Sequence, residues 1–348
     1  MTLTSSDLEK LDLKIPLELD GMISITVKIE GLSDGISKIN AVIDLINAQA
    51  SIPQLNWEKP SGSAGRLHIE ADIRNNKLMK MDTINLVAAD LSLDARAYFD
   101  RESSRLDEII INNLSIGNSK INGIIRSKNK DYYHATLRGA NINLNRFIAK
   151  NTNRQNSTKR TVSISANFDQ VFLWELPPIK NVKFTMETDK SSTIDMTGYV
   201  HQRPVNIKSW EHNKIRKFTF KSDSAGRILK GFDITDSVVG GEIFITGEIV
   251  DNNNVEKTST TISIKDFGLK DAPLFTQILS SASLIGLLDT LRGKGIQFEH
   301  LNAEATFTDK KIIITDSLAY GASLGISATG TIIREDKEAN ITGMRVAA

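Results

Sequence analysis

The stretch DLSLDARAYF, residues 90–99, alternates apolar and polar side chains at every second position. Successive side chains of a β-strand point to opposite faces, so this period predicts a strand with one apolar and one solvated face. The apolar face would carry Leu91, Leu93, Ala95, Ala97 and Phe99. Strands of parallel sheets are buried on both faces, so one-sided strands of this kind favour antiparallel pairing.

The same period recurs along the chain in TVSISANF (161–168), VKFTMET (182–188), EIFITGEI (242–249), LNAEATF (301–307) and SLGISATGTI (323–332). Turn-forming pairs such as Asp34-Gly35 and Gly117-Asn118 separate the strand segments. Few helical segments lie between them, so we expect an all-β chain that runs as a long antiparallel meander. The candidate lining residues of its apolar face are Leu91, Leu93, Phe99, Val162, Ile164, Phe168, Val182, Phe184, Met186, Ile243, Ile245, Ile249, Phe307, Leu324 and Ile326.

Composition and motifs argue against several functional classes. The 348 residues carry a net charge of +1 with 40% hydrophobic and 24% charged residues, which excludes a disordered chain and gives no argument for nucleic-acid binding. There is no cysteine, so disulfides and thiolate chemistry are excluded. The five histidines are scattered, and no phosphate-binding loop, nucleophile elbow or dinucleotide fingerprint is present. We therefore expect neither an enzyme nor a bound metal or cofactor.

Residues 274–296, LFTQILSSASLIGLLDTLRGKGI, break the strand pattern with apolar residues at helical spacing. Asp271 suits an N-cap, and polar residues interrupt the run too often for a membrane span. We expect an amphipathic helix pair over 271–295 that either caps the mouth of the sheet, meets a membrane surface or packs as part of the core. Its cap residues are Leu274, Phe275, Ile278, Leu279, Leu287 and Leu288.

Two shorter helices are also expected. One lies within NLNRFIA (143–149), and the other within DSAGRILKGF (223–232), with Asp223 as its N-cap. The polar run NTNRQNSTKR predicts a loop at 151–160 between strand segments at 1–150 and 161–270, and the chain ends in strands over 296–348. The N-terminal residues lack the pattern of a signal peptide.

The period alone leaves open what covers the apolar face. The sheet could fold onto a second sheet as a sandwich, close on itself as a barrel, or curl into an open trough for an apolar ligand. An Ile, Leu, Val, Ala and Gly lining suits acyl chains and a packed interior equally well.

The segment from Phe218 to Gly343 resembles the C-terminal region of the AsmA-like family of Gram-negative envelope proteins. The resemblance rests on KSDSAGRILKGFDITDSVVGGEIFITGEI, on IKDFGLKDAPLFTQILSSASLIGLLDTLRGKGIQFEHLNAEATF and on ITDSLAYGASLGISATGTI. Residues 1 to about 215 resemble the family more loosely, for example in LRGANINLNRFI.

The resemblance implies an open groove of curled antiparallel strands, apolar inside and polar outside. It also implies non-enzymatic phospholipid transfer across the periplasm, in the service of outer-membrane biogenesis and envelope homeostasis. The partners would be phospholipid acyl chains, a membrane surface and other envelope proteins. Relatives are tethered to the inner membrane by an N-terminal anchor, which this sequence does not show, so we expect a C-terminal part of a longer protein. The alternative is a structural or assembly module of the envelope that folds as a closed β-sandwich.

Overall fold

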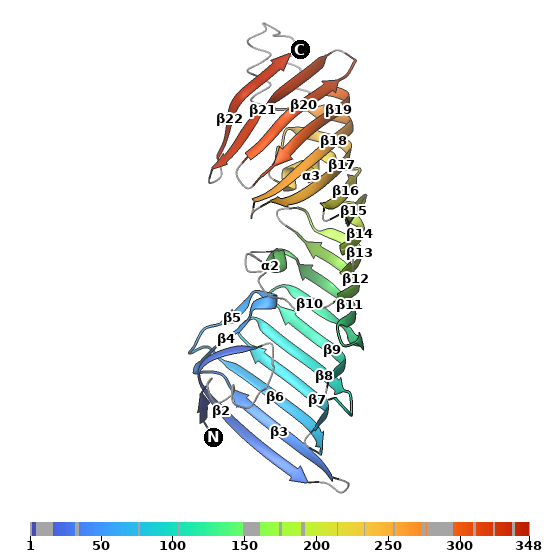
Figure 1. Cartoon of the computed structure of the whole chain (residues 1–348). Helices are drawn as coiled ribbons and strands as arrows, with labels where there is room; N and C mark the ends of the chain where they lie inside the picture. Colours follow the sequence, from blue (N-terminus) through green and yellow to red (C-terminus); the bar gives the residue numbers. More distant parts are fainter. Residues whose placement is uncertain are drawn as a thin grey trace. The chain divides into compact units, whose positions relative to one another are not determined.

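The structure is a computed structural model (Figure 1). It describes the chain except for residues 1, 5–16, 32–34, 76, 104, 149–160, 174–175, 189–191, 214, 233, 253–254, 273–275, 277–294, 309–310, 323, 336–337 and 348. The chain divides into two compact units, Met1–Phe172 and Leu173–Ala348, called here the first and the second unit.

The first unit is a curled sheet whose strands pair almost entirely with their neighbours in sequence (Figure 1). A short hairpin of β4 and β5 follows β3, and β4 pairs with the first residues of the long strand β2. The elements are β1 (Thr2–Thr4), β2 (Glu18–Gly31), β3 (Ile36–Asp44), β4 (Ala48–Ile52), η2 (Pro53–Leu55), β5 (Trp57–Lys59), β6 (Gly65–Arg74), β7 (Lys77–Ala88), β8 (Leu91–Phe99), β9 (Leu106–Ile116), β10 (Ser119–Asn129), β11 (Tyr132–Asn143), α2 (Asn145–Ile148) and β12 (Thr161–Phe172).

The second unit is an antiparallel meander with one helix inserted between β16 and β17. Its elements are β13 (Ile179–Thr188), β14 (Ser192–Val200), β15 (Arg203–His212), β16 (Ile215–Ser222), α3 (Ala225–Gly231), β17 (Val238–Asn252), β18 (Val255–Leu269), β19 (Ile296–Phe307), β20 (Lys311–Tyr320), β21 (Gly325–Glu335) and β22 (Glu338–Ala347). The predicted fold class is therefore confirmed: the chain is all-β, and its strands form long, curled, mostly antiparallel sheets with an open, apolar-lined face.

One strand pair departs from the predicted antiparallel meander. β12 runs parallel to β11, with Ala135 opposite Ile164 and Leu137 opposite Ala166. A parallel pair needs a connection that returns the chain to the edge where the first strand began. The seventeen residues between Asn143 and Thr161 are long enough for that return, and α2 forms part of them. The predicted polar loop at 151–160 lies outside the described residues.

The two short helices form where the sequence placed them, with one correction. The N-cap of α3 is Ser224 rather than Asp223, and its side chain makes no capping hydrogen bond. The helix therefore begins one residue later than expected, and Ala225 and Gly226 in its first turn are buried. Of the helix pair expected over 271–295, only Asp271, Ala272, Thr276 and Gly295 are described, so the cap residues Leu274, Phe275, Ile278, Leu279, Leu287 and Leu288 lie outside the described residues.

Candidate lipid-binding grooves

The apolar residues of the first unit form rows that run across its strands. One row passes from Ile39 on β3 through Ala71, Met81, Ala97, Ile109, Ile125 and Ala135 to Ile164 on β12. A second row brings Ile43, Leu67, Leu86, Leu93 and Leu114 side by side. Neighbouring strands lie about 4.8 Å apart, so each row is a continuous apolar strip rather than a set of isolated side chains.

The second unit repeats this arrangement on its own strands. One row joins Phe184, Met196, Ile207, Phe220, Ile245, Ile262 and Ala303 from β13 to β19. A second row, which runs alongside the first, contains Ile249, Thr258, Phe307, Ile312 and Ile332. Antiparallel register thus places the predicted residues Phe184 and Ile245 in one strip, and Ile249 and Phe307 in another.

The β4–β5 hairpin covers the first sheet along the side where one end of each strand lies. We call this row of strand ends the closed edge; it contains Asp44, Gly65, Ala88, Leu91 and Ile116. There Trp57 of β5 packs with Leu45, Leu91 and Ile116, and all four are at most 2% exposed. The indole Nε1 of Trp57 donates to Asp90 Oδ1 at 3.0 Å, and Arg146 Nη2 reaches the other oxygen of Asp90 at 2.7 Å. These contacts hold the hairpin and α2 to the turn between β7 and β8.

Lys59 is the unusual member of this closed edge. Its side chain is fully buried, and its Nζ donates to the carbonyl oxygens of Ala48 at 2.8 Å and Pro60 at 3.0 Å. Burial disfavours the charged form and lowers the pKa of Lys59, while the Asp44 carboxylate acts in the opposite direction. The Lys59 ammonium group therefore links the start of β4 to the residue after β5 by hydrogen bonds to their backbone carbonyl oxygens.

In the second unit, helix α3 covers one end of the strands in the same way. Ile228 on α3 is fully buried, and Val200, Val205 and Ile243 at the adjoining strand ends are at most 1% exposed. The helix lies close to β17 because Gly226 has no side chain: a Cβ there would be 2.2 Å from the carbonyl oxygen of Val238. A Cβ at Gly231 would likewise meet Leu176 at 2.4 Å.

Away from its closed edge, the apolar face of the first unit is open to solvent. Val27 and Ile29 of β2 stand opposite Ala41 and Ile39, at the end of the apolar rows. They are nevertheless 51% and 64% exposed. Isolated exposed apolar side chains are common on proteins, but Ile29 ends the first row, in which the isoleucines and Met81 are half-buried and the alanines are buried. The row therefore lines a groove with accessible apolar surface.

The predicted lining residues fall into two groups. Leu91, Phe168, Val182 and Ile243 are at most 6% exposed and belong to the packed parts of their sheets. The remaining ones are half-buried and stand on the open part of the apolar faces: Leu93, Phe99, Val162, Ile164, Phe184, Met186, Ile245, Ile249, Phe307, Leu324 and Ile326.

Sequence reasoning missed several residues of the same rows, for a clear reason. β9 contains Ile109, Ile110 and Ile111 in succession, which hides the two-residue period, and pairing with Ala97 and Ile125 identifies Ile109 as the inward residue of the first row. On β18, Ile262 and Ile264 alternate with Ser263 and Lys265, and this two-residue period is as clear as the periods of the strands predicted from the sequence. Ile207 and Phe220 are recognised only from their register with Ile245.

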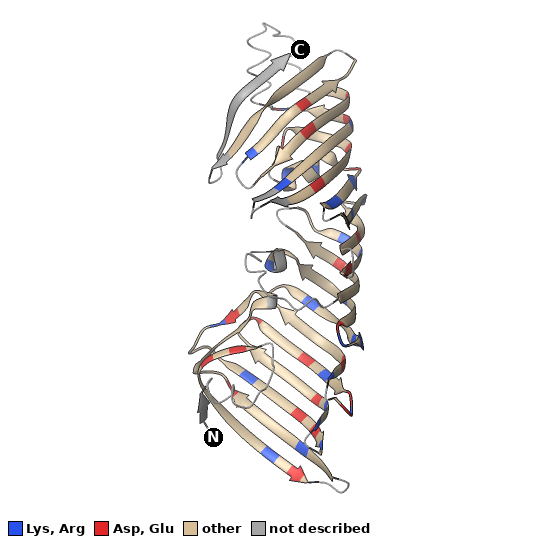
Figure 2. Ribbon diagram, viewed as in Figure 1, with Lys and Arg blue, Asp and Glu red and all other residues tan. Residues whose placement is uncertain are grey.

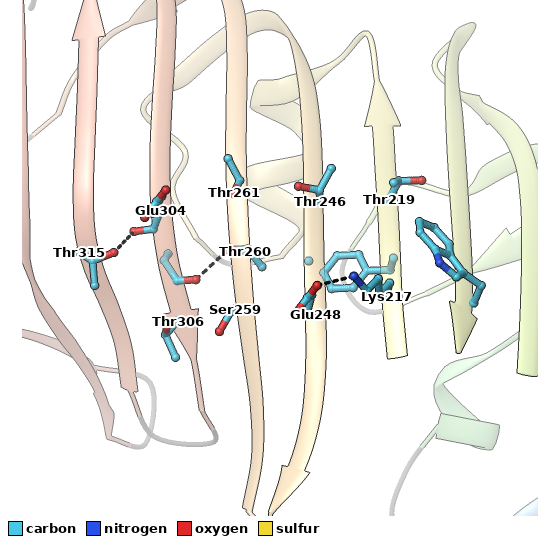
Figure 3. Close-up of a pocket in the computed structure, with 14 residues that line it drawn as sticks. Lys217, Thr219, Thr246, Glu248, Ser259, Thr260, Thr261, Glu304, Thr306 and Thr315 are labelled. Carbon is cyan, nitrogen blue, oxygen red and sulfur yellow. Dashed lines mark hydrogen bonds and ion pairs between the residues drawn. The ribbon is translucent and has the colours of Figure 1, made fainter. Parts of the chain in front are cut away.

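The opposite face of the second sheet is polar (Figure 3). A shallow hollow of about 560 Å³ lies there, lined by hydroxyl and charged side chains together with Trp210. Thr219, Thr246, Thr261 and Glu304 stand side by side in it, and Lys217 Nζ pairs with Glu248 at 2.7 Å. Its hydroxyl and charged groups call for hydrogen bonds and Trp210, Phe218 and Ala305 add only limited apolar surface, so it suits acyl chains less than the apolar face does. The faces of this sheet are thus chemically distinct.

The described residues contain no group of three or more side chains arranged to hold a metal ion. No helix in this same part of the chain is both long and apolar enough to cross a membrane. Comparison of the sequence and structure with protein-family models, curated proteins and solved structures gave no match. The features that bear on function are therefore the apolar faces and the resemblance carried by the sequence itself.

Proposed function

We propose that this chain carries phospholipid, without catalysis, by sheltering acyl chains on the open apolar faces of its two sheets. The observation that supports the proposal is the set of apolar rows that end at the exposed Val27 and Ile29. Each methylene removed from water contributes about 0.8 kcal/mol, so an acyl chain that covers such a strip gains several kcal/mol. The same cover would relieve the protein of exposed apolar surface.

The setting we propose is the periplasm, between the inner and the outer membrane, in a member of the AsmA-like family. This rests on the resemblance of residues 218–343, and the apolar-inside, polar-outside sheets are consistent with it. Transfer along such a surface needs no chemical step, only a continuous apolar strip and a solvated exterior. Because aliphatic side chains form the lining, the chains of different phospholipids should be held with little discrimination between them.

Lipid mass spectrometry of the purified protein tests the proposal, with Ile245→Asp as the variant and Thr246→Asp as its matched control. The two residues are neighbours on β17, and their side chains lie on the apolar and the polar face. We expect phospholipid at near-stoichiometric levels in the wild type and in Thr246→Asp, and a large reduction in Ile245→Asp. The absence of lipid from the wild type, together with failure to take up a fluorescent fatty acid, would contradict lipid carriage. A protein partner retained on the same face would then favour an assembly role.

A further inference from the structure

The second half of β2 is an edge strand of the first sheet (Figure 1). On one side β3 pairs with Ser24–Gly31, while on the other side β1 pairs only with Met22–Ser24. In the part of the chain that the structure describes, no strand pairs with this second side of Thr26–Gly31. Every second residue of an edge strand directs its N–H and C=O away from its neighbour. The segment therefore presents backbone hydrogen-bonding groups that a further strand could use.

The same segment exposes apolar side chains. Ile29 lies opposite Ile39 and ends the first apolar row, and Val27 lies beside it, opposite Ala41. Both side chains are more than half exposed. Proteins often protect such an edge with a proline or a bulge, but the segment contains no proline and its register with β3 is unbroken. The edge is thus a regular template for one more strand.

The charges on this segment are self-complementary. Lys28 and Glu30 are its only charged residues, and their side chains pair with each other, with Lys28 Nζ 2.5 Å from Glu30 Oε1. Figure 2 shows that β2 carries charge of both signs. A run of like charges would repel a second copy of the strand, whereas one charge of each sign, two residues apart, can match the same pair in an antiparallel copy.

One register satisfies both copies. When a two-fold axis passes between the two Ile29 residues, Lys28 of each copy lies opposite Glu30 of the other. An axis at Lys28 or at Glu30 would place two like charges directly opposite each other, which is unfavourable. An axis at Val27 would bring the second copy onto Met22–Ser24, where β1 already pairs.

This register also aligns the apolar rows. A two-fold axis perpendicular to the sheet keeps the apolar faces of both copies on the same side. Ile29 ends the first row in each copy, so the two first rows meet end to end at the axis. The most exposed isoleucine of each row is then covered by its counterpart, which removes apolar surface from water.

We propose that two copies of this chain pair edge to edge through the second half of β2, antiparallel, with Ile29 at the two-fold axis. The interface uses the same patch on both copies, so it closes as a dimer and does not grow into a filament. One short strand segment from each copy makes a small interface, below the roughly 1,200 Å² of stable complexes, so dimerisation should depend on protein concentration. The inference goes beyond the proposed function, and its test requires no lipid.

Analytical ultracentrifugation of the full chain, from about 1 μM to about 1 mM, tests the pairing. We expect a reversible monomer–dimer equilibrium in the wild type. Lys28→Glu and Glu30→Lys each place like charges opposite each other twice in the dimer, and each should weaken self-association at least about tenfold. Lys208→Glu is the control, because it breaks an exposed 3.1 Å pair with Asp195 in the second unit. A wild type that stays monomeric over the whole range would overturn the proposal.

Mixing the two variants tests the register. In a mixed dimer of Lys28→Glu with Glu30→Lys, two glutamates of one chain face two lysines of the other, so association should return to the wild-type level. The double variant Lys28→Glu with Glu30→Lys restores opposite charges within one chain and should also dimerise. Thermal unfolding of each variant confirms that it is folded. If folded single variants dimerise as the wild type does, or if neither the mixture nor the double variant regains association, the register is wrong.

A cysteine at the axis tests the contact directly. The chain has no cysteine, so Ile29→Cys introduces a single thiol. Opposite Cα atoms of antiparallel strands lie about 4.5–5.5 Å apart, within the range that a disulfide bridges. Mild oxidation should therefore produce a covalent dimer from Ile29→Cys, and far less from Met22→Cys, an exposed position of the same strand beside β1. Equal crosslinking of both variants would overturn the contact at Ile29.

Hydrogen exchange separates pairing with a second copy from cover by the chain itself. Protection of Thr26–Gly31 should rise with protein concentration in the wild type and stay constant in Lys28→Glu. A monomer that already protects every backbone amide of this segment would show that the chain covers its own edge, and pairing between copies would be excluded.

Discussion

Ile243 and Ile245 lie two positions apart on one strand and face the same way, yet they differ in burial. Both belong to the apolar face of β17, but Ile243 is 1% exposed beneath α3, whereas Ile245 is half-buried on the open part. An unpaired carboxylate in a dry interior costs several kcal/mol, comparable to the stability of a domain. We therefore expect Ile243→Asp to unfold the second unit and Ile245→Asp to stay folded. Urea denaturation followed by circular dichroism measures both; equal losses would show that the face is packed throughout.

Lys59 gives a prediction on pH. Burial lowers its pKa in the folded protein, so the unfolded chain binds a proton more tightly than the folded chain. The free energy of unfolding then rises with pH through the window from the lowered pKa up to the ordinary value of 10.5. Lys59→Met keeps the buried stem and removes the titration. We expect the stability of the wild type relative to Lys59→Met to increase as the pH is raised toward 10.5. A difference that is flat or falls over this range would contradict a buried, titrating ammonium group.

Single residues also show where sequence reasoning reaches its limit. The period-2 pattern identified the apolar face correctly at Leu91 and Leu93, because alternation is imposed by strand geometry. It could not separate the buried Leu91 from the half-buried Leu93, since both face the same way. What separates them is the hairpin carrying Trp57, which meets only the end of β8.

At the scale of elements, α3 depends on a close approach that the helix sequence alone would not favour. Alanine is the better helix former by about 1 kcal/mol, yet a Cβ at Gly226 would overlap the Val238 carbonyl oxygen. We expect Gly226→Ala to destabilise the second unit by about 1–3 kcal/mol, because overpacking outweighs helix propensity. Gly325→Ala is the control, since a Cβ there meets open space. Thermal unfolding measures both, and a stabilised Gly226→Ala would show that α3 is not docked on β17.

The elements themselves were largely predictable, and their partners only partly so. Turn residues such as Gly117-Asn118 fixed where β9 and β10 separate, because local backbone geometry decides a turn. The parallel pairing of β11 with β12 was not predictable, because it depends on where the chain returns after α2 rather than on either strand's own period. The closing roles of the β4–β5 hairpin and α3 likewise arise from tertiary packing.

For the whole molecule, the sequence period left a sandwich, a barrel and a trough as alternatives, and the family resemblance pointed to the trough. The alternation of residues such as Ile245 and Thr246 is the same in all three, so no local signal could decide. Burial decides for the first unit, because Val27 and Ile29 end apolar rows and are yet exposed. Each sheet also has a closed edge of its own, built from a different element. Packing is therefore organised within each unit.

Because each unit has its own packed interior, we expect a destabilising substitution in one unit to leave the stability of the other unit unchanged. Trp57→Ala removes the centre of the closed edge in the first unit and should cost about 3–5 kcal/mol there. Gly226→Ala loosens the closed edge of the second unit in the same way. Hydrogen exchange read by mass spectrometry on the full chain should show faster exchange at β6–β9 in Trp57→Ala and at β16–β18 in Gly226→Ala, with the other unit unchanged in each. Faster exchange in both units from either single substitution would mean that the two units open as one cooperative body, and the closed edges would not be independent supports.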